Sequence, residues 1–391
     1  MDVIVEGWRF VPHSFAIANQ FQLLEMLDRS EEKDSTLRVF HREMPYLDPN
    51  WMPKPGLFEA AAEDKLHRIP APPEDLRGDA TLRMFMPYNL APSASKRTYV
   101  FGTTEWRIVQ ALMVKSMGVR SFEEAHRNSD TVIITPSNWS RQGFLNAGAV
   151  PERVVVVPHG VDTQVFRPIL NAERERLRRQ WGLDGCFAFL HIGVMTWNKG
   201  IRLLLKAFAA VTERYPHARL VLKGTDAIRK SREFVVGDLR EMLTPVEFDR
   251  VLPRIAYIGK NLSGKQLARL HQVCDAYVAP YLAEGFNMPV LEAAACGLPV
   301  ICTRGGSTDD FTHPSFTGYI DSKLSTVEID KEIRYYLHPD LDRAIDLMSD
   351  IIEKPEFVAQ ARKTAPKFVA SQLTWTHVVD RLLEVMAQKP I

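Results

Sequence analysis

Two glutamates, Glu284 and Glu292, stand eight positions apart across a change from loop to helix. A strand is expected to end near Pro280, Pro289 suits the first turn of a helix, and Gly297 suits its end. The free N–H groups at such a helix start can hold phosphate or sugar hydroxyls. A carboxylate at Glu292 can accept two hydrogen bonds from the vicinal hydroxyls of a ribose, and Glu284 would approach the transferred sugar.

The pair alone has an ordinary alternative interpretation. The chain has 48 acidic residues, so a surface acid and a first-turn acid that complements the helix dipole can occur together by chance. The whole surrounding string favours a site, because it resembles a known signature. The residues expected to contact a donor there are Glu284, Gly285, Phe286, Asn287, Met288 and Glu292.

The string from Glu284 to Val300, Glu-Gly-Phe-Asn-Met-Pro-Val-Leu-Glu-Ala-Ala-Ala-Cys-Gly-Leu-Pro-Val, resembles the signature of the family-four retaining glycosyltransferases. Stretches 135–142, 155–162 and 193–208 resemble the same family in order and spacing. The resemblance implies an α/β chain with the GT-B fold, in which two facing Rossmann-like, doubly wound domains leave a cleft between them. It also implies a nucleotide sugar held mainly by the second domain and an acceptor held mainly by the first.

Lys199 follows a strand and a loop that begins at Gly193, and its ammonium could neutralise a diphosphate as a point charge. The alternative is a solvated loop lysine. The family usually has an arginine directly after the glycine, where this chain has Val194. The cations that could replace it are Arg202, Lys223 and Arg229.

Two further strand ends are candidates for contacts with the nucleotide. Lys223 and Gly224 follow one predicted strand, and Asn261 and Leu262 follow another, where the family resemblance implies a backbone edge that reads the base. Because glycine marks turns of every kind, each could equally be a plain strand-end turn.

In the first domain, Gly7 joins the first strand to a loop that ends at His13, and Glu105 follows a later strand. The resemblance implies that the glycine loop approaches the donor phosphate. His13 could donate to an acceptor or phosphate oxygen, or it could cap or pack, and Glu105 is a candidate for a group near the transferred sugar.

The resemblance implies transfer with retention, in which the departing diphosphate helps to take the acceptor proton. The candidate catalytic residues are Glu284, Lys199, His13 and Glu105. Two alternatives stay open: an epimerase or hydrolase of nucleotide sugars on the same fold, and a catalytically silent binding protein. A dinucleotide-dependent oxidoreductase is less favoured, because no G-x-G-x-x-G follows the first strand or the strand at 188–192.

Strand and helix patterns alternate along the chain and predict two domains of the doubly wound kind. The predicted limits are 1–168 for the first domain and 169–371 for the second, with a terminal helix in 372–391 that packs back on the first. The proline-rich region 51–95 predicts long loops.

The amino-acid composition of the chain excludes several classes of binding partner. A net charge of +1 argues against nucleic acid, and the four cysteines lack metal-ligand spacing, which predicts buried reduced thiols and no metal. The acidic start and the lack of a long apolar run predict a cytoplasmic protein. The expected partners are a UDP- or GDP-linked sugar as donor substrate, no separate cofactor, and a glycan or lipid-linked acceptor, with peripheral contact at the inner face of a membrane as an open alternative.

Overall fold

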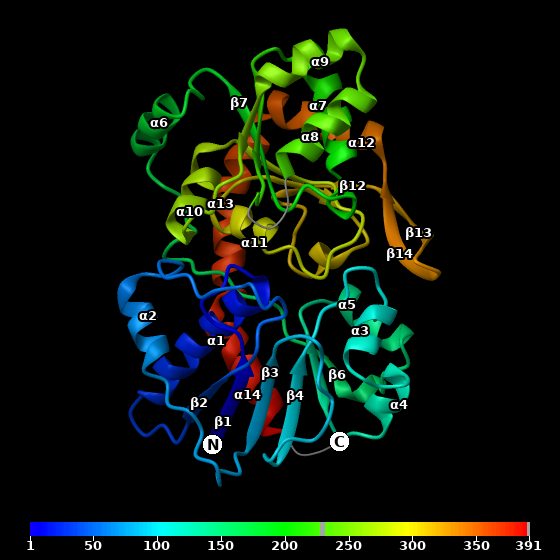
Figure 1. The fold of residues 1–391 in the computed structure, drawn as a ribbon. Helices are drawn as coiled ribbons and strands as arrows, with labels where there is room; N and C mark the ends of the chain where they lie inside the picture. The colour runs from blue at the N-terminus through cyan, green and yellow to red at the C-terminus, as the bar shows by residue number, and fades with distance from the viewer. Residues whose placement is uncertain (227–230, 389–391) are drawn as a thin grey trace. The chain divides into compact units, whose positions relative to one another are not determined.

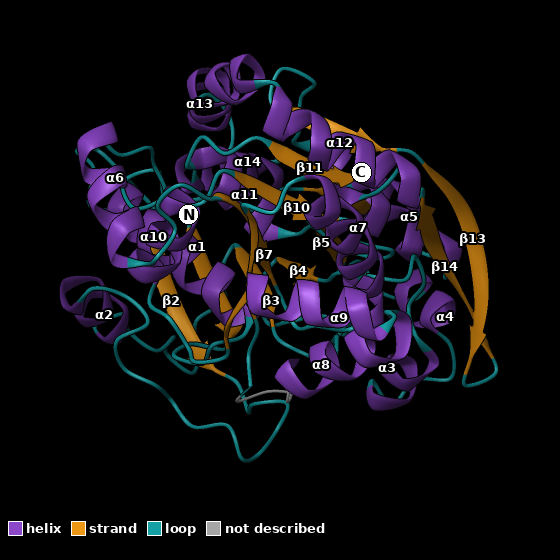
Figure 2. Ribbon diagram, turned by 90° about the horizontal axis from the view of Figure 1, so that it is seen from above, coloured by secondary structure: helices purple, strands orange, loops and turns teal. Residues whose placement is uncertain are grey.

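The computed structural model describes residues 1–226 and 231–388 and divides the chain into two compact units. Unit 1 comprises Met1–Gly160, Glu328–Arg334 and Trp375–Ile391, and unit 2 comprises Val161–Val327 and Tyr335–Thr374. The change from unit 1 to unit 2 at Gly160 lies before the predicted limit at residue 168. Figures 1 and 2 show the sheets and the helices that cover them.

Unit 1 is built on a six-stranded parallel sheet in the order β2-β1-β3-β4-β5-β6. The strands are β1 (Asp2–Gly7), β2 (Arg38–Glu43), β3 (Ala80–Met84), β4 (Arg97–Phe101), β5 (Val132–Thr135) and β6 (Val154–Val156). The helices are α1 (Ser14–Ser30), α2 (Ala60–His67), α3 (Ala111–Ser116), α4 (Phe122–Arg127), α5 (Asn138–Asn146) and α14 (Trp375–Ala387). The strand order changes direction between β1 and β3, which is where ligands bind in sheets of this kind.

The prediction of long loops over 51–95 is wrong in part. The segment contains α2 and β3, and all five residues of β3 are buried between β1 and β4. The strand escapes a hydropathy reading because it is short and carries Arg83 as its fourth residue. The guanidinium is accommodated there because its Nε lies 3.0 Å from Glu6 Oε2 on the neighbouring strand.

Unit 2 is built on a second parallel sheet in the order β12-β11-β10-β7-β8-β9. The strands are β7 (Phe187–Ile192), β8 (Ala218–Lys223), β9 (Ile255–Ile258), β10 (Ala276–Ala279), β11 (Val300–Thr303) and β12 (Thr317–Ile320). The helices are α6 (Asn171–Gln180), α7 (Ile201–Arg214), α8 (Ser231–Met242), α9 (Pro245–Val251), α10 (Gly264–Val273), α11 (Met288–Ala295), α12 (Leu341–Glu353) and α13 (Pro355–Ala370). Read from β9, this is the Rossmann order 3-2-1-4-5-6, with its switch point between β7 and β10. The predicted α/β, doubly wound class is confirmed.

A two-stranded sheet follows β12 and was not predicted. Its strands are β13 (Ser322–Ile329) and β14 (Glu332–Pro339). Only Asp330 and Lys331 connect them, both with positive φ (54° and 63°), as a two-residue hairpin turn requires. An Asp-Lys pair is a weak hairpin signal compared with Asn-Gly or Asp-Gly, and this is why the sequence did not reveal it.

Helix α14 occupies the middle of the predicted terminal helix and belongs to unit 1, where it packs against α1. The indole of Trp375 stacks on Phe21 with ring centroids 5.0 Å apart and planes 8° from parallel. Among the described residues, no helix combines the length and the apolar character that crossing a membrane requires.

All four cysteines are free. Cys274, Cys296 and Cys302 are buried as predicted, and burial raises the pKa of each thiol. Cys186 is half-buried, because it lies in the turn just before β7 rather than inside the sheet.

A buried ion-pair network ties α6 to the sheet of unit 2. The Asp275 carboxylate accepts hydrogen bonds from Arg174 Nη2 (2.6 Å), Arg178 Nη1 (2.9 Å) and the backbone N–H of Ala188 (2.8 Å). Each of these side chains is less than one fifth exposed. Two charged guanidinium groups therefore depend on one buried carboxylate.

We expect Asp275→Ala to lower the free energy of unfolding by about 3 kcal/mol, because removing one member of a buried ion network leaves the others uncompensated. Glu175→Ala, on an exposed position of α6, is the matched control and should change it by less than about 0.5 kcal/mol. Chemical denaturation measures both. Equal effects for the two variants would contradict a structural role for the network.

Candidate functional site

The candidate site of unit 2 lies at the switch point of its sheet. Strands β7 and β10 are neighbours in the sheet but lead to helices through different loops. The loop after β7 runs from Gly193 to Gly200 and includes the 3₁₀ turn Trp197–Lys199, and the loop after β10 contains Glu284. Parallel strands that diverge in this way leave a crevice at their carboxyl ends.

Gly200 holds these two loops together. Its φ is 72°, and a Cβ at this position would overlap Pro280 O at the end of β10. Only glycine therefore allows the turn before α7 to approach β10. Asn198 extends the contact: its backbone O accepts from Leu282 N (2.7 Å), and its Nδ2 donates to the backbone O of Ala283 (3.2 Å).

The two loops bring together two of the predicted catalytic residues. Lys199 Nζ donates to Glu284 Oε1 at 2.5 Å. The Glu284 side chain is 8% exposed and that of Lys199 is 19% exposed. An ion pair sequestered to this degree is electrostatically stronger than a surface pair, and the carboxylate holds the ammonium of Lys199 in a fixed position on the turn before α7.

The start of α11 closes the other side of this loop. Asn287 is the N-cap in a left-handed conformation (φ 78°), and its side chain does not cap the helix. Phe286 is buried and stacks on Phe311 with centroids 4.4 Å apart, so it supports the loop from below rather than facing a ligand. Gly285 is buried and Met288 is half-buried. Pro289 lies in the first turn, where its missing N–H costs nothing.

Glu292 lies in the second turn of α11, and its side chain is 15% exposed. Its Oε2 is 3.5 Å from Nε2 of His271, which is fully buried on α10. Glu292 and Glu284 therefore contact different partners, a histidine and a lysine. The spacing of eight residues places Glu284 on the loop after β10 and Glu292 on helix α11.

Sequence reasoning missed a buried layer of rings beneath this site. His191 on β7 stacks near Tyr277 on β10 (6.4 Å between centroids), and Tyr277 lies near His271 (5.7 Å). Nδ1 of His191 bonds the backbone O of Val278 at 2.8 Å, whereas its Nε2 has no hydrogen-bond partner among the described residues. Burial lowers the pKa of His191 to about 4, so the ring is neutral near pH 7. His191 could have been predicted from the sequence, because it lies at the end of a predicted strand, two residues before Gly193.

Nε2 of His191 faces the predicted phosphate loop. A Cβ built on Gly193 would lie 4.0 Å from this nitrogen and 3.9 Å from Lys199 Cγ. The Gly193 backbone is thereby bordered by a neutral acceptor nitrogen and by the stem of the lysine. The structure brings Gly193, Lys199 and Glu284 together, with His191 as an additional member.

The two strand ends that were predicted to border the base, after β8 and after β9, show fewer features of a binding site. Lys223 is buried at the end of β8, its Nζ donates to Gly224 O, and burial lowers its pKa. Gly224 has no room for a side chain, because a Cβ would overlap the Tyr257 hydroxyl. Asn261 is exposed and Leu262 half-buried in the loop after β9. Their contact with a nucleotide stays a prediction.

The cation expected after Gly193 has no clear replacement. The guanidinium of Arg202 bonds Glu241 (2.8 Å) and turns toward α8, and Lys223 turns to its own backbone. Arg229 lies outside the described residues. Lys199 is thus the cation that the described part of the chain places at this loop.

Unit 1 has a cavity at its own switch point, at the carboxyl ends of β1, β3 and β4. Its volume is about 240 Å³, and both His13 and Glu105 line it. Aromatic and aliphatic side chains form most of the remaining wall, namely those of Phe15, Met86, Tyr88, Trp106, Ile108, Val109 and Met113. Gly7 is not part of the wall: a Cβ there would lie 2.8 Å from Asn19 Nδ2 and 2.9 Å from Met84 Cβ, so this glycine serves close packing.

His13 caps α1, as one of its two predicted roles required. Its Nδ1 accepts from the backbone N–H of Phe15 at 3.2 Å, which leaves the proton of the neutral ring on Nε2. Burial lowers the pKa of His13 to about 4. Near pH 7 the ring therefore remains neutral and can donate one hydrogen bond from Nε2.

Among residues 1–226 and 231–388, no three or more His, Cys, Asp or Glu side chains are grouped so that they could hold a metal ion. The groups gathered at the unit 2 site are instead an ammonium, two carboxylates, the imidazoles of His191 and His271, and backbone amides. This set can bind a diphosphate and the hydroxyls of a sugar or ribose.

Comparisons with known proteins agree with this chemistry. Residues 187–334 match the family model described as "Glycosyl transferases group 1". A D-inositol 3-phosphate glycosyltransferase of Pseudarthrobacter chlorophenolicus is 34% identical over 176 residues, which cover 45% of this chain and 40% of the relative. The mannosylfructose-phosphate synthase of Agrobacterium fabrum is 25% identical over 67% of this chain and 53% of the relative. The chain thus spans about half the length of the curated relatives that it matches.

Solved structures support the fold. Anabaena Alr3699/HepE, solved with UDP and glucose, has a TM-score of 0.68 at 14% identity and covers 99% of both chains. A sucrose-phosphate synthase from Thermosynechococcus elongatus has a TM-score of 0.66 at 15% identity and covers 98% of both chains. The predicted GT-B fold is confirmed.

We expect His13 to titrate near pH 4 rather than 6.5, because its burial disfavours the imidazolium. Between these values the unfolded chain binds a proton that the folded chain does not, so His13 lowers the free energy of unfolding as pH falls from about 6.5 to 4. NMR of ring-labelled histidine measures the pKa directly. His13→Asn preserves a capping oxygen and removes the titration, which assigns the signal. A His13 midpoint near 6.5 would contradict the buried, neutral state.

Proposed function

Because the chain belongs to the group 1 glycosyltransferases with the GT-B fold, we propose that it transfers a hexose from a nucleotide-diphosphate sugar to an acceptor hydroxyl with retention at the anomeric carbon. The observation that carries the proposal is the Lys199–Glu284 ion pair at the switch point of unit 2. It fixes an ammonium on the turn before α7 and a carboxylate on the loop before α11, and a diphosphate that takes over the ammonium from Glu284 would be favoured by that charge and by the free N–H groups of a helix start.

In this proposal the diphosphate lies against Gly193 and receives hydrogen bonds from Lys199. Glu292 accepts hydrogen bonds from the two ribose hydroxyls, and Nε2 of the buried His271 lies 3.5 Å from this carboxylate. The backbone near Gly224 and Asn261 borders the base. A UDP- or GDP-linked donor fits this scheme, since both have the same ribose diphosphate.

The reaction breaks the bond between the anomeric carbon and the diphosphate oxygen and forms a bond from that carbon to the acceptor oxygen. The acceptor proton passes to the departing phosphate oxygen, so no metal or cofactor enters the balance. Lys199 and the N–H groups at the start of α11 stabilise the negative charge that develops on the diphosphate. Their fixed positions make this stabilisation available without reorganisation.

Glu284 has two functions in this scheme. Before the donor binds, it neutralises and orients Lys199 at 2.5 Å. When the diphosphate shares the ammonium, the carboxylate is available to a sugar hydroxyl and stabilises the positive charge that develops on the ring. Burial of Glu284 strengthens both effects, because the local dielectric is low.

The cavity of unit 1 is our candidate for the acceptor site. His13 can donate from Nε2, Glu105 can accept, and the rest of the wall is largely apolar. A glycan or lipid-linked acceptor would suit such a wall. We propose a cytoplasmic enzyme, with peripheral membrane contact if the acceptor is lipid-linked.

We expect one class among UDP-, GDP- and dTDP-sugars to raise the thermal midpoint of the protein and to be turned over in the presence of EDTA. Glu292→Ala should weaken binding of the matching nucleoside diphosphate at least tenfold, about 1.4 kcal/mol, because the ribose loses its acceptor. Lys199→Met should weaken binding of the nucleoside diphosphate but leave binding of the free nucleoside unchanged. Calorimetry with nucleoside and diphosphate separates the two effects.

Glu175→Ala, an exposed acid of α6, serves as the control for loss of an acid in unit 2 and should bind as the unaltered protein does. Diphosphate release that does not depend on an acceptor would instead indicate a hydrolase or epimerase. Absence of binding to every donor class would reject the transferase proposal in favour of a silent protein.

We expect an α-linked donor to give an α-linked product, because the same phosphate that leaves takes the acceptor proton on that face. Proton NMR of the glycosidic product measures the anomeric configuration of the new linkage. A β-linked product would refute retention while leaving the donor site intact.

A further inference from the structure

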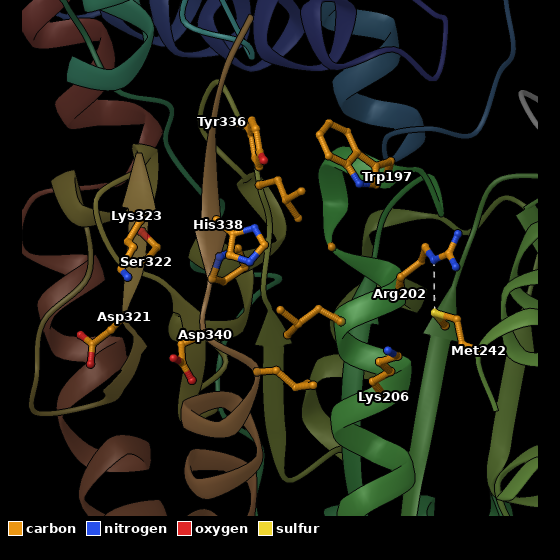
Figure 3. A pocket seen from close by; sticks show the side chains of 15 residues that line it. Trp197, Arg202, Lys206, Met242, Asp321, Ser322, Lys323, Tyr336, His338 and Asp340 are labelled. Carbon is orange, nitrogen blue, oxygen red and sulfur yellow. Dashed lines mark hydrogen bonds between the residues drawn. The ribbon is translucent and has the colours of Figure 1, made fainter. Parts of the chain in front are cut away.

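A second and larger cavity of unit 2 lies beside the donor loops rather than in them. Its volume is about 660 Å³, and Figure 3 shows it between the first turns of α7 and the base of the β13–β14 hairpin. This volume is typical of sites for small molecules and short oligomers. None of the proposed donor-binding residues lines it.

Two aromatic rings stand at one end of the cavity. The indole of Trp197 and the phenol of Tyr336 have centroids 5.2 Å apart and planes 54° from parallel, and Figure 3 shows them side by side. Trp197 is 42% exposed on a 3₁₀ turn. Aromatic side chains with a polar end that remain this exposed are enriched where proteins bind ligands, because they combine apolar area with a hydrogen-bonding edge.

The opposite end of the cavity carries charged groups of both signs. Lys206 on α7 and Lys323 on β13 supply two ammonium groups, and Asp321 and Asp340 supply two carboxylates. The remaining cation, Arg202, is bonded to Glu241 outside the cavity at 2.8 Å. The lining is therefore nearly balanced in charge and does not favour a polyanion.

This combination matches the surface of a neutral sugar chain. The C–H faces of a sugar ring pack on aromatic rings, carboxylates accept from vicinal hydroxyls, and ammonium groups donate to hydroxyl oxygens. We propose that the cavity binds an uncharged oligosaccharide. Oligosaccharide binding in this cavity does not depend on the proposed function. A role of the cavity as a secondary binding site for a glycan acceptor or product rests on the proposed function.

Backbone contacts connect this cavity to the donor site. Leu337 N, next to Tyr336, donates to Leu282 O (2.7 Å), and Leu282 N donates to Asn198 O (2.7 Å). Asn198 lies between Trp197 and Lys199 on the same turn. A sugar chain that packs on Trp197 and Tyr336 therefore contacts the loop of Lys199 directly and is linked to the loop of Glu284 through the Leu337–Leu282 hydrogen bond, so it should stiffen both loops.

The test uses maltotetraose, cellotetraose and mannotetraose as neutral probes, with trigalacturonate as the acidic probe, on the full chain at millimolar concentrations. Calorimetry and the fluorescence of 5-fluorotryptophan-labelled protein report binding. We expect at least one neutral tetrasaccharide to bind better than trigalacturonate. Tyr336→Ala and Asp321→Asn should each weaken it at least fivefold, whereas Tyr336→Phe, which retains the ring, should change it less than twofold.

Leu324→Ala is the matched control, since Leu324 is exposed on the same hairpin but outside the cavity. It should bind as the unaltered protein does, as should Glu292→Ala and His13→Asn. Binding that is lost in His13→Asn, or kept in both Tyr336→Ala and Asp321→Asn, would overturn the proposal, as would a preference for the acidic probe or no binding at all. Donor turnover with no tetrasaccharide binding would reject this inference alone.

Discussion

The close approach of two loops at the switch point of unit 2 is the constraint on which the site depends. Gly200 can lie against Pro280 because it has no Cβ and adopts a positive φ. That approach brings Lys199 within 2.5 Å of Glu284, from a distance of 85 residues in the chain. Any larger side chain at residue 200 would push the two loops apart and separate the ammonium of Lys199 from the carboxylate of Glu284. The ammonium that a diphosphate would meet would then no longer be held in place.

Beneath this contact, unit 2 contains a buried layer of rings with polar atoms. His191, Tyr277 and His271 lie ring to ring between the end of β7 and Glu292 on α11. Burial keeps His191 neutral, so its Nε2 is an acceptor rather than a second cation near Lys199. Lys199 is thus the cation that the described residues place at this loop, beside Val194.

Both units have a candidate site at the switch point of a parallel sheet, but the side chains at the two switch points differ in charge. In unit 2 the switch point between β7 and β10 is charged, and in unit 1 the switch point between β1 and β3 opens into a mostly apolar cavity with His13 and Glu105 in its wall. The groups that differ lie on loops after the strands, Lys199 and Glu284 in unit 2 and His13 and Glu105 in unit 1. An enzyme that binds a charged donor and a less charged acceptor would need such a contrast.

The sequence by itself determined the fold class, because alternating strand and helix patterns admit few arrangements, and it marked Glu284, Glu292 and Lys199 through a loop-to-helix string with turn residues at both ends. It did not reveal β3, whose Arg83 is neutralised by Glu6 on another strand, or the β13–β14 hairpin, whose Asp-Lys turn is a weak signal. Only the tertiary structure decided which residues meet. The contacts of Lys199 with Glu284, of Glu292 with His271 and of Trp197 with Tyr336 join segments far apart in the chain, and such distances depend on the packing of whole elements rather than on any local pattern.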